Sequence, residues 1–452
     1  MSPSLFGTDG VRGVANSRLT PELAFNLVRA ATGFFLERRG QGDFCPRIIM
    51  GRDTRRSGDM IGAAAASAAM SCGVDVIDMG VVPTPAVAHA TASCDANVAG
   101  LVISASHNPS EYNGIKFFDA SGYKLAPQDE GEIERGMGEN GPRPQGSALG
   151  RLFRGDREVW EYLEHLTASL GLDRDSLAGL RVAMDCANGA GYRLGPAAFR
   201  SAGASVTSIF DSPDGDNINV ECGSTKPESL IGMMTSGDYD VGFALDGDAD
   251  RLVAVSPLGK VLDGDDLLYI IARDMIQEGE LANETVVVTM INNLGLGACL
   301  EPLGVETVQC PVGDREIMIK MRETGANLGG EISGHLVLGH CATTGDGILS
   351  ALTIARALLN RGQGIEEMVM DFTKYPQIVE NVPVSDREGL EEDQTIEEAI
   401  SRGRKRLGES GRIIVRPSGT EPVIRILVEG PDRELIEEIA DDLADIVAQR
   451  LG

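Results

Sequence analysis

Short apolar runs alternate with glycine-containing turns and helix-like segments along most of the chain. The run RIIMG at residues 47–51 is followed by a helical pattern of small residues near 59–71. The same order recurs after LRVAMD at 180–185 and after TVVVTMI at 285–291, where the turn NNLGLG precedes a helix. Strands that alternate with helices in this way predict parallel or mixed sheets covered by helices on both faces.

The last 80 or so residues carry a different pattern. Two apolar runs, RIIVR at 412–416 and VIRILVEG at 423–430, stand between a charged helical pattern at 395–408 and a long amphipathic pattern at 431–450. This order predicts an α+β module. The segment EGLEEDQT at 388–395 is acidic and poor in apolar residues, which is typical of a surface loop.

These patterns predict the domain organisation. At about 150 residues per domain, 452 residues suggest roughly three domains, with two or four equally allowed. We expect an α/β protein with three α/β domains that contain mixed sheets and a C-terminal α+β domain. The expected domains are residues 1–153, 154–256, 257–370 and 371–452.

The net charge of −28 at neutral pH limits the partners that the protein can bind. DNA, RNA and anionic lipid bind proteins mainly through Lys and Arg side chains, so a surface this acidic repels them. We therefore expect a small-molecule partner, and neither nucleic acid nor membrane. If that molecule carries phosphate, the protein must gather positive side chains locally, against its own overall field.

Cysteine usage and apolar runs indicate a cellular compartment. The eight cysteines include no C-x-x-C pair, which argues against a disulfide framework and a zinc site. The start MSPSLFGTDG lacks the features of a signal peptide, and no apolar run reaches the 18 or so residues of a membrane helix. We expect a cytoplasmic protein, and a homodimer is allowed.

The segment ISASHNPSEYNGIKFF at 103–118 is the first of four loops with chemical potential. A strand is expected to end near Ser104, which places Ser106 and His107 beyond its C-terminal end, where open α/β sheets bind ligands. Lys116 follows on the next predicted strand. Ser106 is thus a candidate nucleophile or phosphoryl carrier; the alternative is a polar loop with an N-cap serine.

The segment LDGDADR at 245–251 places three aspartates in one short loop: Asp246, Asp248 and Asp250. Their carboxylates can converge on a hard cation such as Mg²⁺ or Ca²⁺. An EF-hand loop is excluded by spacing, because Arg251 and Pro257 stand where that loop needs Gly and Glu. The alternative is a solvated acidic turn, but crowded carboxylates repel one another unless a cation neutralises them.

The segment GGEISGH at 329–335 alternates Glu331, Ser333 and His335 with small or apolar residues. Carboxylate and hydroxyl groups of this kind hydrogen-bond to sugars. A glycine-rich turn with incidental polar residues is an equal alternative, and His335 alone fits a structural histidine.

The segment RPSGTEPVIR at 416–425 places Ser418, Gly419 and Thr420 between Arg416 and Arg425. Backbone N–H groups and hydroxyls flanked by guanidinium groups suit a dianionic phosphate. The segment is not a Walker loop, because G-K-[ST] is absent. The alternative is a polar turn between two strands.

With these motifs the chain resembles the α-D-phosphohexomutases over essentially its whole length, from FGTDGVRG (6–13) to the RPSGTEP segment. Four segments resemble the branch that acts on glucosamine phosphate: FGTDGVRG, NINVECGST (217–225), VGDRE (312–316) and TTGDGI (343–348). The resemblance implies four domains around a central active-site cleft, with each of the four loops on a different domain. Ile332 occupies a position that varies between branches, so it gives no information on the amino group.

The resemblance also implies roles for individual residues. Ser106 is the serine phosphorylated in the resting enzyme, and Asp246, Asp248 and Asp250 hold one Mg²⁺ together with a phosphoserine oxygen. Glu331 and Ser333 bind sugar hydroxyls, with Arg251 also at the substrate. Lys116, Arg12 and His335 are candidates for proton transfer. The non-reacting phosphate is bound by Arg416, Ser418, Gly419, Thr420 and Arg425.

The implied reaction interconverts glucosamine 6-phosphate and glucosamine 1-phosphate, which feeds UDP-N-acetylglucosamine synthesis. Phosphorylated Ser106 gives its phosphoryl group to the substrate, and glucosamine 1,6-bisphosphate turns over before its other phosphate returns to the serine. Three alternatives stay open: the same machinery acting on glucose or mannose phosphate, a phosphatase, and a sugar-phosphate sensor without catalysis.

Overall fold

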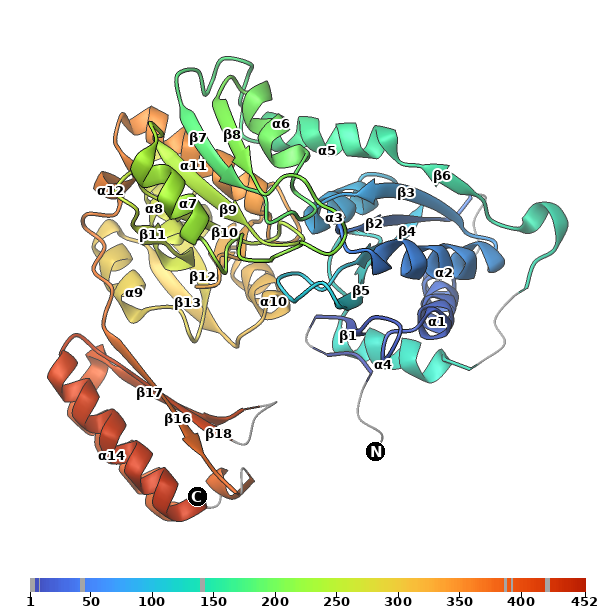
Figure 1. Cartoon of the computed structure of the whole chain (residues 1–452). Coiled ribbons are helices and arrows are strands. Elements are labelled where there is room, and N and C mark those ends of the chain that lie inside the picture. Colours follow the sequence, from blue (N-terminus) through green and yellow to red (C-terminus); the bar gives the residue numbers. More distant parts are fainter. Residues whose placement is uncertain are drawn as a thin grey trace. The chain divides into compact units, whose positions relative to one another are not determined.

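A computed structural model describes residues 5–7, 9–40, 45–138, 143–385, 388–391, 393–418 and 423–452 (Figure 1). The chain separates into two compact units. The first unit consists of Met1–Ile291 and Gly304–Met370, and the second of Asn292–Leu303 and Asp371–Gly452. Three sheets belong to the first unit and one to the second.

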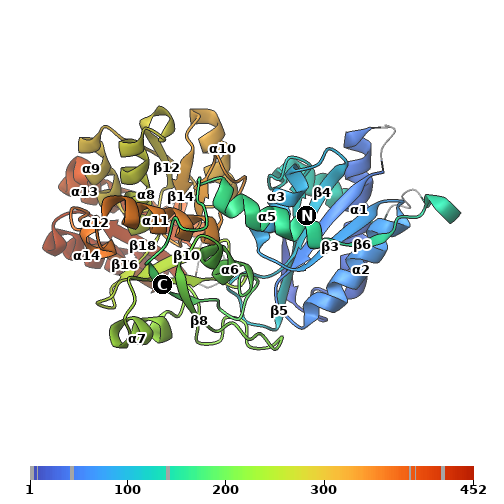
Figure 2. The ribbon, with the colours of Figure 1, turned by 90° about the horizontal axis from the view of Figure 1, so that it is seen from above.

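The first sheet has six strands in the order β1-β5-β4-β2-β3-β6. In this sheet the pairs β4–β2, β2–β3 and β3–β6 are parallel, while β5 is antiparallel to both β4 and β1. The strands are β1 (Val11–Val14), β2 (Arg47–Arg52), β3 (Asp75–Val81), β4 (Asn97–Ile103), β5 (Tyr112–Asp119) and β6 (Leu152–Arg154). One face packs on α1 (Pro21–Arg39), α2 (Ser57–Ser71) and α4 (Pro127–Gly136), and the other on α3 (Thr84–Ala92) (Figure 2).

The second sheet has the order β11-β10-β9-β7-β8, with β7 parallel to β8 and β9 and the remaining pairs antiparallel. Its strands are β7 (Arg181–Asp185), β8 (Ser205–Ile209), β9 (Val241–Leu245), β10 (Leu252–Val255) and β11 (Val261–Leu262). Its helices are α5 (Asp156–Ala168), α6 (Leu194–Ser201) and α7 (Glu228–Ser236). Every residue of β9 and β10 is buried, as expected for strands covered on both faces.

The third sheet has the order β13-β12-β14-β15, and only the β14–β15 pair is antiparallel. Its strands are β12 (Thr285–Thr289), β13 (Glu306–Cys310), β14 (Leu328–Gly330) and β15 (Leu336–Leu338). The associated helices are α8 (Gly264–Glu278), α10 (Asp314–Thr324), α11 (Gly347–Arg361) and α12 (Ile365–Met368). Side-chain caps start two of them: Asp263 and Asp266 form a capping box on α8, and Asp346 accepts from the first N–H groups of α11.

The second unit contains an antiparallel sheet in the order β16-β18-β17. Its elements are α9 (Leu294–Leu300), β16 (Gln377–Pro383), α13 (Gln394–Leu407), β17 (Arg412–Pro417), β18 (Val423–Glu429) and α14 (Arg433–Leu451) (Figure 1). The core of this unit is formed by apolar residues that the three strands and the helices α13 and α14 share.

The predicted fold class is confirmed, and so are the strands at 47–51, 180–185 and 285–291, which correspond to β2, β7 and β12. The surface loop predicted at 388–395 is partly wrong. Residues Glu388–Glu391 form a 3₁₀ turn, and α13 begins at Gln394 because the Asp393 side chain accepts from the N–H groups of Thr395 and Ile396. Residue 392 lies outside the described residues. The boundaries of the four expected domains remain a prediction.

None of the helices in the described part of the chain combines the length and the apolar character that crossing a bilayer requires.

Candidate active site

The loop between β4 and β5 holds Ser106 in a left-handed backbone conformation, with φ of 51°. A non-glycine residue adopts this conformation only where its surroundings enforce it. The Ser106 N–H donates to Ser104 Oγ at 2.9 Å, and Ser104 Oγ donates to Asp53 Oδ2 at 2.6 Å. Ser106 is 1% exposed. The loop therefore presents this hydroxyl at a fixed position.

A buried arginine fastens the same loop. The Arg55 guanidinium donates to the carbonyls of Ser106 and Asn108, each at 2.8 Å, and its Nε donates to Asp53 Oδ2 at 2.8 Å. Two further acceptors are the carbonyls of Pro109 and Tyr112. Burial raises the pKa of Asp53, and the neighbouring Arg55 charge opposes that shift. The pair thus forms a charged scaffold beneath Ser106.

Sequence reasoning missed this scaffold. Asp53 and Arg55 follow β2 directly, at the same edge of the sheet as Ser106, and that position was the available signal. Asn219 was also missed, although it lies in the segment NINVECGST. Its Nδ2 donates to the Ser106 carbonyl at 2.9 Å and to the Asn108 carbonyl at 3.1 Å.

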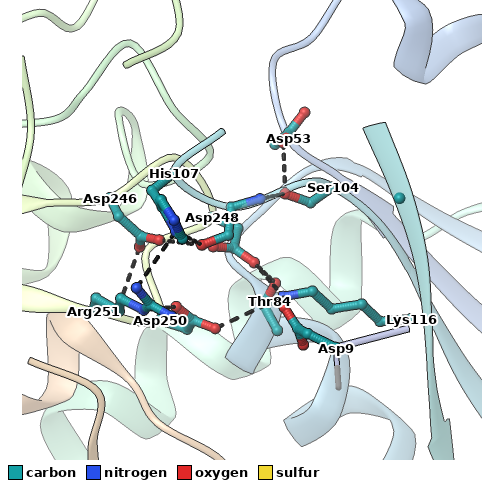
Figure 3. A network of polar contacts seen from close by, with 12 residues as sticks. Asp9, Asp53, Thr84, Ser104, His107, Lys116, Asp246, Asp248, Asp250 and Arg251 are labelled. Atoms are coloured by element: carbon teal, nitrogen blue, oxygen red, sulfur yellow. Dashed lines mark hydrogen bonds and ion pairs between the residues drawn. The ribbon is translucent and has the colours of Figure 1, made fainter. Parts of the chain in front are cut away.

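The acidic loop after β9 reaches Ser106. Ser106 Oγ donates to Asp246 Oδ2 at 2.6 Å across a separation of 140 residues. Asp246, Asp248 and Asp250 are all buried, and each offers a carboxylate oxygen within 4.8 Å of the others. Burial, and then the charges of Asp248 and Asp250, raise the pKa of Asp246 well above its usual value. Figure 3 shows these three side chains gathered beside His107.

The aspartate cluster fits a divalent cation. Asp248 Oδ1 and Asp250 Oδ1 are buried and accept no hydrogen bond, although a buried carboxylate oxygen without a partner is costly. Oxygen ligands are those that Mg²⁺ prefers, and a serine phosphate at Ser106 would add another oxygen at the same place. The predicted metal ligands are therefore brought together with the predicted phosphoserine.

Lys116 and Asp9 flank the cluster (Figure 3). Lys116 Nζ lies 2.9 Å from Asp248 Oδ2 and 3.1 Å from Asp9 Oδ2. Burial alone would raise the pKa of Asp248, but Lys116 holds it below its usual value. Burial likewise opposes the charge of Lys116, yet Asp248 and Asp9 raise the Lys116 pKa, so the ammonium stays charged. Thr84 Oγ1 also donates to Asp248 Oδ2, at 2.7 Å.

Three further residues predicted for proton transfer or substrate contact, Arg12, His335 and Arg251, lie in the same unit. Arg12 forms an ion pair with Asp9. His335 is buried, with Nδ1 3.7 Å from Asp250 Oδ2, while Nε2 accepts from the Gly345 N–H at 3.1 Å. Burial opposes a charge on His335, but Asp250 raises its pKa. The Arg251 N–H donates to Asp246 Oδ1 at 3.2 Å.

The predicted sugar loop links β14 to β15. Glu331 accepts from the Gly313 N–H at 3.1 Å through Oε1 and from Ser333 Oγ at 3.0 Å through Oε2. Gly334 has φ of +86°, and a Cβ atom there would lie 1.9 Å from the Leu252 carbonyl oxygen. Only glycine allows this approach, which fixes the sugar loop to the strand that follows the aspartate cluster.

The predicted phosphate loop lies in the second unit, between β17 and β18. Arg416 and Arg425 are direct cross-strand partners, so their side chains share one face of the sheet. The Ser418 N–H donates to the Val423 carbonyl at 2.9 Å. Gly419 and Thr420 lie outside the described residues. Two like charges opposite each other are unfavourable unless an anion or another partner offsets them.

Comparisons with known proteins match the full chain. Four family models, described as phosphoglucomutase/phosphomannomutase alpha/beta/alpha domains I, II and III and C-terminal domain, match residues 3–143, 160–259, 263–375 and 380–446. Phosphoglucosamine mutase of Desulforamulus reducens is 46% identical over 446 residues, covering 98% of this chain and 99% of its own. That of Carboxydothermus hydrogenoformans is 45% identical over 448 residues, with 98% and 99% covered.

Solved structures share the fold. A phosphoglucomutase/phosphomannomutase family protein of Burkholderia thailandensis has a TM-score of 0.83 at 24% identity, covering 100% of this chain and 98% of its own. An N-acetylphosphoglucosamine mutase of Aspergillus fumigatus has a TM-score of 0.64 at 18% identity, with 98% and 95% covered. At these identities the likeness concerns the fold alone.

Proposed function

The chain belongs to the phosphoglucomutase/phosphomannomutase family, and on that premise we propose that it interconverts glucosamine 6-phosphate and glucosamine 1-phosphate. The relatives named phosphoglucosamine mutase, which match at full length, support this choice of sugar. The observation that carries the proposal is the hydrogen bond from Ser106 Oγ to Asp246 Oδ2 inside the buried aspartate cluster.

In the proposed reaction Ser106 carries a phosphoryl group in the resting enzyme. The free hydroxyl of the substrate attacks phosphorus, the bond between phosphorus and Ser106 Oγ breaks, and glucosamine 1,6-bisphosphate results. Its other phosphate then returns to Ser106. Asp246, Asp248 and Asp250, with an oxygen of the serine phosphate, would hold one Mg²⁺, which would neutralise charge on the transferring group.

Other residues bind substrate and manage protons in this proposal. Glu331 accepts hydrogen bonds from sugar hydroxyls, Ser333 donates to or accepts from them, and Arg251 contacts the substrate. Lys116, Arg12 and His335 are assigned to proton handling near the attacking hydroxyl. Because Lys116 stays charged, its ammonium can donate a proton to the departing Ser106 oxygen, and overall the proton that the attacking hydroxyl loses is replaced by one gained at Ser106 Oγ. The non-reacting phosphate is bound by Arg416, Ser418, Gly419, Thr420 and Arg425, and the cross-strand pairing of the two arginines supports that site.

The same proposal places the protein in the cytoplasm, with a hexosamine phosphate as its partner. It predicts four domains with boundaries near residues 153, 256 and 370.

Ser106→Ala tests the central step, with Ser110→Ala from the same loop as the control. Incubation with glucosamine 1,6-bisphosphate should add the mass of one phosphate to the wild type and to Ser110→Ala, but not to Ser106→Ala. We expect Ser106→Ala to lose turnover and keep its fold by circular dichroism. Near wild-type turnover in Ser106→Ala would refute the mechanism, and steady release of phosphate without isomerised product would indicate a phosphatase instead.

A further inference from the structure

The proposed substrate differs from glucose 6-phosphate by the amino group at C2, which carries a positive charge when protonated. This inference rests on the proposed function and concerns the residue that distinguishes the two sugars. An ammonium group that leaves water needs a negative partner, because burying an unpaired charge is costly. A carboxylate beside the sugar loop is therefore required.

Most carboxylates near the site already face cations. Asp246, Asp248 and Asp250 converge on the candidate metal position. Asp9 forms ion pairs with three cations: Lys116, Lys124 and Arg12. Glu331 and Asp314 lie next to the sugar loop outside these two groups, and Asp314 shares Lys124 with Asp9.

Asp314 is the first residue of α10, and its side chain is 17% exposed. Its Oδ2 forms an ion pair with Lys124 Nζ, and its Oδ1 accepts from the Arg315 N–H at 2.7 Å. Burial alone would raise the pKa of Asp314, but Lys124 and His335 hold it below its usual value, so the carboxylate is charged at neutral pH. The group is thus anionic and accessible from one side.

Asp314 also lies beside the carboxylate expected to bind sugar hydroxyls. The preceding residue, Gly313, donates its N–H to Glu331 Oε1 at 3.1 Å. Because consecutive Cα atoms are about 3.8 Å apart, Asp314 starts one residue away from that contact. A hexose whose hydroxyl groups contact Glu331 would therefore bind next to Asp314.

Residues from three segments that are distant in the sequence meet at this position. Lys124 Nζ forms ion pairs with Asp9 of FGTDGVRG and with Asp314 of VGDRE. Thr343 and Thr344 of TTGDGI line a small cavity together with Lys124 and Asp314. None of the three segments contains a residue of the metal or phosphoserine loops.

We propose that Asp314 is the specificity-determining carboxylate that pairs with the C2 ammonium of the substrate. Lys124 balances its charge while the sugar is absent and retains Asp9 as a partner when the ammonium arrives. Glu331 binds hydroxyl groups, which glucose and glucosamine phosphates share, and therefore does not discriminate between them.

The test is the ratio of kcat/KM for glucosamine 6-phosphate to kcat/KM for glucose 6-phosphate. Asp314→Asn should lower this ratio about 10- to 100-fold, the range expected for the loss of a charge-assisted hydrogen bond. Lys124→Met removes the competing cation and should leave the ratio unchanged or raise it. Glu331→Gln should lower kcat/KM for both sugars and leave the ratio within about twofold, because it removes a contact common to both.

Of the two partners of this ion pair, only Asp314 is predicted to lower the ratio when it is replaced, whereas a purely structural ion pair would give the same effect from either side. An unchanged ratio in Asp314→Asn, a lowered ratio in Lys124→Met, or a collapse of the ratio in Glu331→Gln alone would each overturn the inference. If Asp314→Asn turns over neither sugar, the dissociation constants of both sugar phosphates in a Ser106→Ala background give the same ratio.

Failure of the proposed function has a separate signature. A wild-type enzyme that prefers glucose 6-phosphate would contradict the glucosamine assignment whatever Asp314→Asn does. A wild type that prefers glucosamine 6-phosphate, combined with an unchanged ratio in Asp314→Asn, would remove this inference alone.

Discussion

Replacing Arg55 by Met tests how the Ser106 loop is held. The Arg55 and Asp53 side chains are both 0% exposed, and Arg55 is also the donor to four carbonyl groups of the loop. Methionine retains much of the volume but removes the charge and every donor. Asp53 then stays buried beside Ser104 Oγ without its counter-ion.

Removing one partner of a buried ion pair costs about 3–5 kcal/mol, because the remaining charge has lost both water and its partner. The carbonyl groups that lose a donor add to this cost, so we expect the free energy of unfolding of the first unit to fall by at least about 3 kcal/mol. The left-handed conformation of Ser106 also loses support. A displaced reacting group should lower kcat about 10- to 100-fold.

The neighbouring Arg56 gives a matched control. Its ion pair with Asp216 is exposed, with 71% and 61% of the two side chains accessible to solvent. Arg56→Met should leave both the unfolding transition and kcat close to those of the wild type, because exposed ion pairs contribute little. Urea unfolding followed by circular dichroism, together with steady-state kinetics, compares the two variants. Equal losses in Arg55→Met and Arg56→Met would refute the reasoning.

Two further predictions concern stability. Burial and the neighbouring His165 lower the pKa of His89 from 6.5 to about 4, so between these values the unfolded chain binds a proton that the folded chain does not. The contribution of His89 to the free energy of unfolding should be fully present above pH 6.5, and this free energy should fall by at most about 3 kcal/mol as the pH drops to 4. His89→Phe should remove this part of the pH dependence of the free energy measured by urea unfolding. Gly334→Ala should destabilise the sugar loop and raise KM, because the added Cβ would lie 1.9 Å from the Leu252 carbonyl oxygen at a φ of +86°. Gly362→Ala is the control: Gly362 also has a positive φ, but a Cβ added there would meet no atom within 4 Å, so the substitution should change stability alone.

The sequence was sufficient to predict where each chemical loop begins. Ser106 follows β4 and Asp246 follows β9, and both strands were recognisable as apolar runs that end in polar residues. Ligands bind beyond the C-terminal ends of such strands in open α/β sheets, so the position of each loop follows from its strand. The periodicity of α13 and α14 was equally clear, because each helix buries one stripe of apolar residues.

Contacts between distant segments could not be predicted in the same way. Arg55 and Arg56 are adjacent and chemically identical, yet one is buried and the other exposed. Nothing in the local pattern distinguishes them, because burial depends on the loop that folds over Arg55 from residues 106–112. The ion pair of Lys124 with Asp314 spans 190 residues for the same reason. The pattern of apolar and polar residues predicts helices and strands, whereas tertiary packing determines which polar side chains form ion pairs and hydrogen bonds with each other.

The arrangement of these partners fixes the charged groups of the site before a substrate binds. Charges alternate along a continuous chain of ion pairs, from Asp248 through Lys116, Asp9 and Lys124 to Asp314. Lys116 is buried, the Lys124 side chain is 10% exposed, and each is flanked by carboxylates, so both side chains are already ordered before the substrate arrives. Groups held in this way stabilise developing charge without reorganising during the reaction. The three carboxylates of this chain of ion pairs exceed its two ammonium groups, so in a protein with a net charge of −28 the phosphate must be attracted by other cations, such as the cross-strand pair Arg416 and Arg425.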